Sequence, residues 1–400
     1  MQNGNLSSSP LRQIPRAVWA LGFVSLLMDT SSEIIHALLP VYLVSMLGAS
    51  MLDVGVIEGI AEATASITKI FSGALSDWLG KRKPLAVVGY GLAALSKPIF
   101  PLAPSLGWLI AARFIDRVGK GIRGAPRDAL IADITPPHLR GASFGLRQSL
   151  DTVGAFVGPA LGIGLMWLTA NNFQIVFWLA VIPAFLCVSL LVFGVHEPAP
   201  RGKQRRVRSP LSVKELKQLG ADYWSVVGLA GIISIARFSE AFLILHAQAS
   251  GLPVTLVPLV LVVMNVVYAL AAYPAGALSD TANRVSVLAL GLGFLIAADL
   301  AFVFMGGLAG VTVGVALWGL HMGFSQGLLA SLVADTSPAE LRGTAYGVFN
   351  LLTGLAALVA SILAGALWDF NGSQATFIAS AILAGLALAS LAAVRRRAPS

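Results

Sequence analysis

Long apolar stretches alternate with short polar connectors along almost the whole chain. A helix that crosses lipid hydrocarbon needs about 20 residues, and apolar runs of about that length or longer occur twelve times. They cover residues 17–47, 53–77, 84–103, 106–131, 142–169, 173–194, 223–248, 255–279, 285–305, 308–334, 344–367 and 374–394. The pattern predicts an all-α integral membrane protein with about twelve transmembrane helices.

Basic residues gather in every second connector. The odd connectors (48–52, 104–105, 170–172, 249–254, 306–307 and 369–373) contain no Lys or Arg. The even connectors do contain them, at Lys81 to Lys83, Arg140, residues 201–217, Arg284 and Arg342, and both ends of the chain are basic as well. Because Lys and Arg are in excess on the cytoplasmic side, we expect both termini and all even connectors in the cytoplasm, with the chain in the cell's inner (plasma) membrane.

Two sequence motifs occur twice. The pentad Gly-Ala-Leu-Ser-Asp stands at 73–77 and at 276–280, an offset of 276 − 73 = 203. The segments 133–145 and 335–347 share a Pro, a Leu-Arg-Gly and a later Gly at an offset of 335 − 133 = 202. Two matches at nearly one offset indicate an internal repeat of about half the chain.

The repeat predicts the domain organisation. We expect an N-terminal six-helix bundle at 1–194, a cytoplasmic linker at 195–221 and a C-terminal six-helix bundle at 222–400. Each half contains an even number of predicted spans, so the halves share an orientation and form parallel repeats. Such an arrangement surrounds a central cavity that can open alternately to each side of the membrane.

Composition supports the membrane class and narrows the function. The chain is 56% hydrophobic and 12% charged, whereas soluble domains have about 25% charged residues. The net charge of +8 lies in the connectors, so we expect no nucleic-acid partner. The single Cys187 excludes an intramolecular disulfide. The sequence has no zinc-spaced His/Cys set, Gly-x-Ser-x-Gly motif or phosphate-binding loop, so we expect neither an enzyme nor a cofactor or metal, and no direct use of ATP.

Ionisable residues inside the predicted spans are the candidates for function, because each costs roughly 2.5–3.5 kcal/mol to insert. Several fall at helical spacing and form stripes on one face, which we expect to line the cavity. The expected substrate-cavity residues are His36, Glu58, Glu62, Lys69, Lys97, Arg117, Arg147, Arg237, Glu240, Asn265, Tyr268, Trp318 and His321.

Some of these residues have structural alternatives. Arg147 with Asp151, and Arg237 with Glu240, are at spacings that also suit an ion pair within one helix. Helix packing is the alternative for Tyr268 and Trp318, and a hydrogen-bonded packing position is the alternative for His36. Residues at the end of the fourth span, Arg123, Arg127 and Asp128, are also compatible with contacts to lipid headgroups.

Asp29 and Glu33 differ from the other charges because both are acidic and lie one helical turn apart near mid-membrane. Two carboxylates so close repel each other when both are ionised. One of them is therefore expected to take up a proton readily, which proton coupling requires.

The segment after the second span carries a family motif. Gly73, Asp77, Gly80, Lys81 and Arg82 follow the pattern G-x-L-x-D-R-x-G-R-R, with Trp78 in place of the usual Arg. This segment resembles the signature between the second and third spans of the major facilitator superfamily, and the likeness extends over essentially the whole chain. The resemblance implies that this cluster acts as a gate that steadies the outward-open state.

Two further motifs resemble the drug:proton antiporters of that family. The segment from Arg113 through Asp116 to Gly121 is similar to the span 4 signature, whose Arg is linked to proton transfer. Gly154, Gly158, Pro159 and Gly162 follow the span 5 antiporter signature G-x-x-x-G-P-x-x-G. The resemblance therefore implies export, and we assign proton coupling to Asp29, Glu33, Arg113 and Asp116.

The leading hypothesis is a secondary active transporter that exports a small organic molecule in exchange for protons. An alternative is a transporter of an anionic solute, such as an organic phosphate or carboxylate, because basic residues accompany the acidic ones. A non-transporting membrane sensor is the alternative from another class. We expect a monomer whose partners are a small-molecule substrate, protons and the lipid bilayer.

Overall fold

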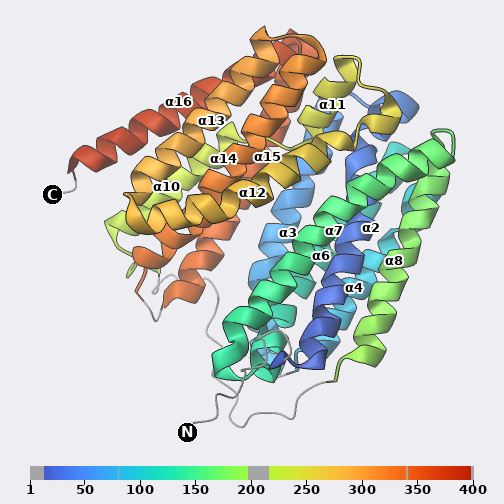
Figure 1. Ribbon diagram of the computed structural model, residues 1–400, viewed down its shortest axis with the longest axis vertical. Coiled ribbons are helices and arrows are strands. Elements are labelled where there is room, and N and C mark those ends of the chain that lie inside the picture. Colours follow the sequence, from blue (N-terminus) through green and yellow to red (C-terminus); the bar gives the residue numbers. More distant parts are fainter. Residues whose placement is uncertain (1–12, 80, 197–215, 339–340, 398–400) are drawn as a thin grey trace, which may run out of the picture.

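Helices account for nearly all of the chain that the computed structural model describes, which is residues 13–79, 81–196, 216–338 and 341–397 (Figure 1). The helices before residue 197 are α2 (Arg16–Leu47), α3 (Met51–Leu79), α4 (Lys83–Ser96), α5 (Ile99–Leu102), α6 (Leu106–Ile134), α7 (Arg140–Leu168) and α8 (Phe173–Gly194). The later helices are α10 (Ala221–Ala236), α11 (Ala241–Ala249), α12 (Leu259–Thr281), α13 (Arg284–Phe304), α14 (Gly307–Asp335), α15 (Arg342–Asn371) and α16 (Ser373–Arg397). The prediction of an all-α membrane protein is confirmed.

Two predicted spans are interrupted. The span 84–103 breaks at Lys97, where Pro98 lacks the backbone N–H that would continue the helix. The span 223–248 breaks between Ala236 and Ala241, where no Pro or Gly marks the position. There the carbonyl of Ala236 accepts a hydrogen bond from the Ser380 hydroxyl at 2.8 Å, which replaces a bond of the helix.

Ten helical segments of the described chain are long and apolar enough to cross a membrane. Helices α3 and α6 are 29 residues each, yet they are not among the ten. Their polarity explains this, because they carry most of the charged stripes predicted from the sequence. Helix α3 packs between α15 and α6, and α6 also packs on α4, so the charged faces of both helices can be turned to neighbouring helices rather than to lipid.

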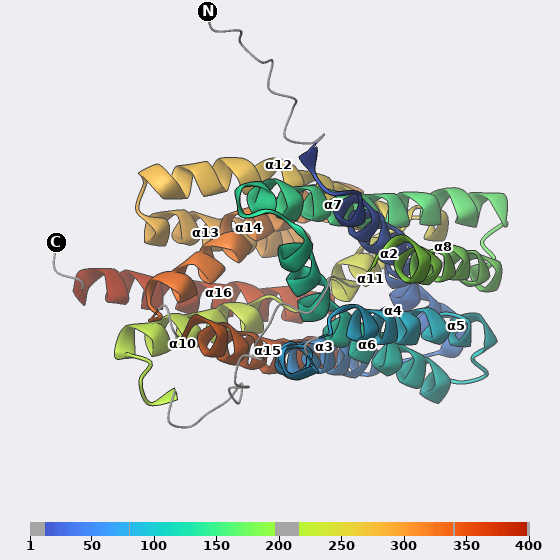
Figure 2. The ribbon, with the colours of Figure 1, turned by 90° about the horizontal axis from the view of Figure 1, so that it is seen from below.

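The helices form two groups that lie side by side, α2 to α8 and α10 to α16 (Figures 1 and 2). The groups meet where α3 packs on α15 and where α7 packs on α12. The predicted linker 195–221 connects them, but its residues 197–215 lie outside the described chain. The domain boundaries stay a prediction, and the two groups of helices are consistent with them.

The apolar core is shared by the two groups at one end only. Near the odd connectors, one cluster of buried residues joins Leu38 and Leu43 of α2 to Phe242 and Leu245 of α11 and to Leu261 of α12. Towards the even connectors, the buried residues instead form separate clusters inside each group. The two groups are therefore joined at the odd-connector end and have independent cores at the other.

Glycines bring the groups into close contact along α3 and α15. A Cβ added at Gly59 would lie 2.8 Å from the side chain of Leu358 and 3.0 Å from its backbone. A Cβ added at Gly365 would lie 2.8 Å from the Cα of Leu52. Small residues permit such approach of two backbones in lipid, so this seam has no room for larger side chains.

Equivalent ion pairs close the even-connector end of each group. Arg82 lies 3.6 Å from Asp133, and Arg284 contacts Asp335. Both residues of the second pair stand 202 positions after those of the first (284 − 82 and 335 − 133). The repeat recognised in the sequence is thus also a repeat of side-chain contacts.

Candidate functional site

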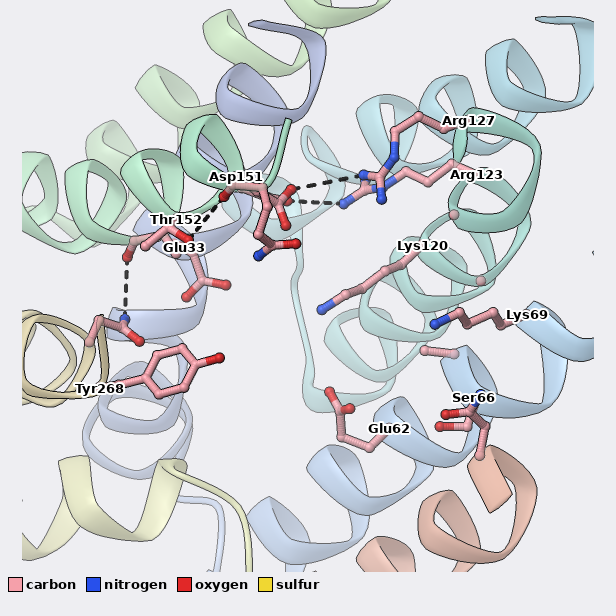
Figure 3. Close-up of a pocket in the computed structure, with 18 residues that line it drawn as sticks. Glu33, Glu62, Ser66, Lys69, Lys120, Arg123, Arg127, Asp151, Thr152 and Tyr268 are labelled. Carbon is pink, nitrogen blue, oxygen red and sulfur yellow. Dashed lines mark hydrogen bonds and ion pairs between the residues drawn. The ribbon is translucent and has the colours of Figure 1, made fainter. Parts of the chain in front are cut away.

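Two neighbouring cavities, of about 420 and 350 Å³, lie between the groups. The first is lined by residues of α2, α3, α6, α7, α12 and α15, which are Asp29, Glu33, Glu62, Ala65, Ser66, Lys69, Lys120, Gly121, Arg123, Gly124, Arg127, Gln148, Asp151, Thr152, Ala155, Asn265, Tyr268 and Asn350. Glu62, Ser66 and Asn350 also line the second cavity. The two cavities therefore adjoin each other, and Figure 3 shows the first.

Asp29 of α2 reaches across the first cavity to α6. Its carboxylate lies 3.3 Å from the Arg123 guanidinium, which also stands over the ring of Tyr90 at 4.9 Å. Arg127, one turn further along α6, contacts Asp128 at 3.0 Å and lies 3.9 Å from Asp151 of α7. Arg123 and Arg127 thus lie at the cavity wall. They belong to the half of α6 that the charge bias predicts to be on the cytoplasmic side.

A chain of polar contacts leads from the cavity into the protein interior. The Glu33 carboxylate, which lines the cavity, lies 3.3 Å from His36 Nδ1, and His36 Nε2 lies 3.6 Å from Glu58. Glu58 in turn receives hydrogen bonds from Arg113 Nη2 at 2.9 and 3.0 Å. The side chains of Glu58 and Arg113 are 2% and 3% exposed. A buried ion pair is therefore connected to the cavity through one imidazole.

A second buried pair stands beside the break of the third span. The ammonium of Lys97 donates to Asp116 at 2.8 Å and to Ser32 of α2 at 3.0 Å. Directly after Asp116, Arg117 lies 3.3 Å from Glu62, whose side chain is 47% exposed. Because α6 supplies one member of each pair, this helix holds α2, α3 and the third span together electrostatically.

Two glycines of the span 5 motif pack directly against the acidic residues of α2. A Cβ added at Gly154 would lie 2.7 Å from the carbonyl of Leu26 and 3.1 Å from the Cβ of Asp29. A Cβ added at Gly158 would lie 2.6 Å from the Cβ of Glu33. The motif therefore sets the position of both carboxylates, while Gly162 makes ordinary contact with Pro258 of the other group.

Two lysines face the cavity without an anionic partner. Lys69 of α3 and Lys120 of α6 extend into the first cavity, and neither ammonium makes a hydrogen bond or ion pair within the described part of the chain (Figure 3). All four carboxylates of the same cavity do have a basic partner within 4 Å. Among the described residues, the lysines are thus the charged groups of this wall that lack a close ion pair.

The second group contributes mostly neutral polar side chains. Asn265 and Tyr268 of α12 line the first cavity, and Arg237, at the α10–α11 break, lines the second. The spacing of Arg237 and Glu240 allowed an ion pair, but none within 4 Å joins them among the described residues. Asn265 Nδ2 instead donates to the carbonyl of Ala155 of α7 at 3.4 Å.

Trp318 and His321 were expected at the cavity, yet neither lines the two cavities described. Both are fully buried in α14, and His321 Nδ1 contacts the carbonyl of Gly291 at 2.9 Å. Trp318 packs against Phe238, with ring centroids 5.3 Å apart. Their face of α14 meets α10, α11 and α13 rather than the cavity. Helical spacing shows which residues share a face, but it does not show whether that face meets other helices or a cavity.

The other expected residues divide between wall and interior. Glu62, Lys69, Asn265 and Tyr268 line the first cavity, as do the predicted proton-coupling residues Asp29 and Glu33. Residues tied into ion pairs behind the wall are His36, Glu58, Lys97, Arg113, Asp116, Arg117 and Arg147. The expected site lacked Lys120, Arg123 and Asn350, although the basic stripe of the fourth span was visible in the sequence.

The predicted gate is described in part. Arg82 donates to Ser76 at 2.8 Å and pairs with Asp133, and Gly73 makes ordinary contact with Ala125 of α6. Gly80 and the side chain of Asp77 lie outside the described residues. The gate's role stays a prediction.

The chain is similar to known membrane transporters. The family model of the Major Facilitator Superfamily matches residues 21–361. An uncharacterized MFS-type transporter of Methanocaldococcus jannaschii is 32% identical, over 96% of each chain. The inner membrane transport protein YajR of Escherichia coli is 26% identical over 93% of this chain and 81% of its own.

Two further matches are a relative that covers only part of the chain and a solved structure with a similar fold. The multidrug resistance protein MdtH of Photorhabdus laumondii is 34% identical over 39% of this chain and 38% of its own. A bacterial homolog of the human lysosomal transporter Spinster, solved in an inward-facing, occupied conformation, has a TM-score of 0.76 at 17% identity, over 98% of each chain. At that identity the likeness supports the fold alone.

Proposed function

The chain belongs to the Major Facilitator Superfamily and is a multi-pass membrane transporter, and from that premise we propose that it exchanges protons for a small organic molecule, which it exports. The observation that carries the proposal is the charged central cavity, into which Asp29 and Glu33 project from one face of α2. In this proposal residues 1–194 and 222–400 are the two moving units. The chain acts as a monomer in the inner membrane, with both termini and the linker 195–221 in the cytoplasm.

Alternating access is supported by where the two groups are joined. The shared apolar core lies at the odd-connector end, and the cores are separate at the even-connector end. With the basic even connectors in the cytoplasm, this is an inward-open arrangement. Rocking of the groups about the glycine seam of α3 and α15 would close the cytoplasmic side and open the other.

Proton coupling is supported by the contacts of Glu33 and Asp29. Glu33 faces the cavity while sharing His36 with the buried Glu58–Arg113 pair. A proton that binds Glu33 removes its charge and weakens its hold on His36, so protonation changes the contacts between α2 and α3. Asp29 is placed likewise, because a proton on its carboxylate weakens the contact to Arg123 of α6.

Export is supported by the span 5 motif and by MdtH. The packing of Gly154 and Gly158 against α2 couples the position of both carboxylates to α7. Helix α7 also contacts α12 of the other group, so movement between the groups reaches the carboxylates directly. The partial match to a multidrug resistance protein is consistent with an outward direction.

The test uses everted membrane vesicles that hold an acid interior and contain a pH-sensitive dye. Ethidium, tetraphenylphosphonium, benzoate, citrate and glycerol phosphate would be added one at a time. At least one compound is expected to release protons from wild-type vesicles, and Glu33→Gln and Asp29→Asn should abolish or sharply reduce that release. Asp222→Asn, an exposed carboxylate of α10, is the matched control and should behave as wild type. Proton release that persists undiminished in both cavity variants contradicts the proposal.

A further inference from the structure

The carboxylates of the first cavity are all engaged. Asp29 pairs with Arg123 at 3.3 Å and Glu62 with Arg117 at 3.3 Å. Asp151 lies 3.3 Å from Arg147, and Glu33 lies 3.3 Å from His36. A positively charged substrate would have to displace one of these partners before it could pair with a carboxylate.

The free charges of the cavity are positive. Lys69 and Lys120 project into the same space from α3 and α6. These helices approach closely beside the lysines, since a Cβ added at Gly121 would lie 2.8 Å from the carbonyl of Ala65. Two like charges held near each other in a partly dry space attract an anion strongly.

Arg237 adds a third cation at the far side of the same space. It lines the second cavity and has no ion pair among the described side chains. Glu240, its neighbour at the helix break, also has no ion pair there, but it lines neither cavity. Among its described residues, the second group therefore contributes no carboxylate to the lining of either cavity.

Neutral hydrogen-bonding groups form another part of the wall. Asn265 and Tyr268 come from α12, Asn350 from α15 and Ser66 from α3. Amides and hydroxyls both donate and accept hydrogen bonds. They suit the polar part of a small molecule, while Ile233, Leu329 and Phe349 give the second cavity an apolar side.

From this arrangement we infer that the transported molecule is a small organic anion, whose carboxylate or phosphate group is held between Lys69 and Lys120 while its polar body faces Asn265 and Tyr268. The inference rests on the proposed function and specifies its substrate class. Each lysine donates up to three hydrogen bonds and carries a point charge, so one acidic group can contact both. Reagents and variants that change only charge can test it.

The first experiment measures the sign of the potential in the cavity. Ala155, which lines the cavity, is replaced by Cys, and Cys187 is fully buried and serves as a silent background. The thiol is modified separately with negatively charged sulfonatoethyl methanethiosulfonate and positively charged trimethylammonioethyl methanethiosulfonate. The ratio of the two rates, referred to a small thiol in solution, cancels the intrinsic reactivity of the cysteine.

We expect the ratio to favour the anionic reagent and to fall about tenfold when Lys69→Gln and Lys120→Gln are combined. Lys69→Arg with Lys120→Arg should retain the preference. Lys217→Gln, at an exposed site outside the cavity, should change nothing. A preference for the cationic reagent, or a ratio that the double Gln variant leaves unchanged, overturns the inference.

The second experiment asks whether anions occupy the space. Succinate, citrate and glycerol phosphate are tested for protection of the Ala155→Cys thiol against a neutral maleimide, with glucose and tetraphenylphosphonium as neutral and cationic comparisons. Protection by at least one anion that disappears in the double Gln variant supports the inference. Protection by tetraphenylphosphonium alone, or by none of the anions, refutes it.

Neither experiment depends on a proton gradient. If anions protect the thiol but release no protons from vesicles, the proposed antiport fails and the anion site stands. If a cation drives proton release and the cavity prefers cationic reagents, the antiport stands and the anion site fails.

Discussion

The carboxylate of Asp369, at the end of α15, accepts a hydrogen bond from the backbone N–H of Leu52, at the start of α3, at 2.9 Å. The neighbouring N–H of Met51 donates to the same carboxylate at 3.0 Å. The first N–H groups of a helix have no partner inside it and attract negative charge. One group of helices thus caps a helix of the other at the odd-connector end, so opening that end must break the cap.

Asp369→Ala is therefore expected to favour opening of the odd-connector end. Loss of a cap costs about 1–2 kcal/mol, which corresponds to roughly a 5- to 30-fold change in population. Labelling of a cysteine placed at Ala364, in the shared core, by a membrane-impermeant maleimide should rise accordingly. Asp53→Ala is the matched control, because the Asp53 carboxylate accepts a hydrogen bond from the backbone N–H of Ser50, which belongs to the same group of helices. Equal labelling in the two variants would contradict a role of the Asp369 cap in holding this end closed.

Gly158 should not tolerate a side chain, whereas Gly164 of the same helix should. A Cβ at Gly158 would press on Glu33, and nothing lies within 4 Å of a Cβ at Gly164. Gly158→Val is expected to lower the melting temperature and abolish proton release in vesicles. Gly164→Ala should preserve activity and stabilise α7 slightly, because Ala favours helix by about 1 kcal/mol over Gly. Thermal unfolding and proton release are measured for both variants. Loss of activity in both would mean that any substitution in α7 impairs transport, whether or not it contacts α2.

Removal of Arg113 alone should be more damaging to stability than removal of the whole pair. Arg113→Met leaves Glu58 buried with His36 as its remaining partner, and an uncompensated buried charge costs about 3–5 kcal/mol. The double variant Arg113→Met with Glu58→Leu should recover most of that loss in thermal unfolding. Transport should stay impaired in both, because the polar path from Glu33 through His36 no longer reaches Arg113. A double variant as unstable as the single one would contradict this account.

Asp299 should be replaceable by Asn but not by Leu. The Ser380 hydroxyl lies 2.8 Å from the carbonyl of Ala236 and 2.6 Å from the carboxyl of Asp299. A hydroxyl has one hydrogen, so when it donates to Ala236 the second contact needs a donor at Asp299. The Asn amide supplies one, and Leu leaves the hydroxyl oxygen unsatisfied at a cost of about 1–3 kcal/mol. Thermal unfolding of the two variants, compared with Ser380→Ala, measures the difference.

The apolar pattern predicted the helices well because a lipid solvent imposes a simple rule on length and polarity. Each predicted run coincides with one helix or with two short helices, and only the break after Ala236 lacked a local signal. That break depends on Ser380, which is distant in sequence. Interactions of this kind cannot be obtained from periodicity, which concerns one helix at a time.

The sequence predicted which residues belong to the candidate site, but it did not predict which of them contact each other. Helical spacing placed Asp29 and Glu33 on one face of α2, and both line the cavity. The same spacing could not indicate that Asp29 meets Arg123 while Arg113 meets Glu58, because partners depend on how α2, α3 and α6 cross. Nor could it show that Lys69 and Lys120 have no hydrogen bond or ion pair with the residues that the structure describes, which is the feature that suggests a substrate charge.

The shared apolar core at the odd-connector end has a thermal consequence. If that end opens to water during transport, residues such as Phe242 and Leu245 exchange protein neighbours for solvent. Exposure of apolar surface raises the heat capacity, so the activation enthalpy of turnover would itself change with temperature. An Arrhenius plot of the transport rate would then curve, and substitutions that shrink this core would flatten it.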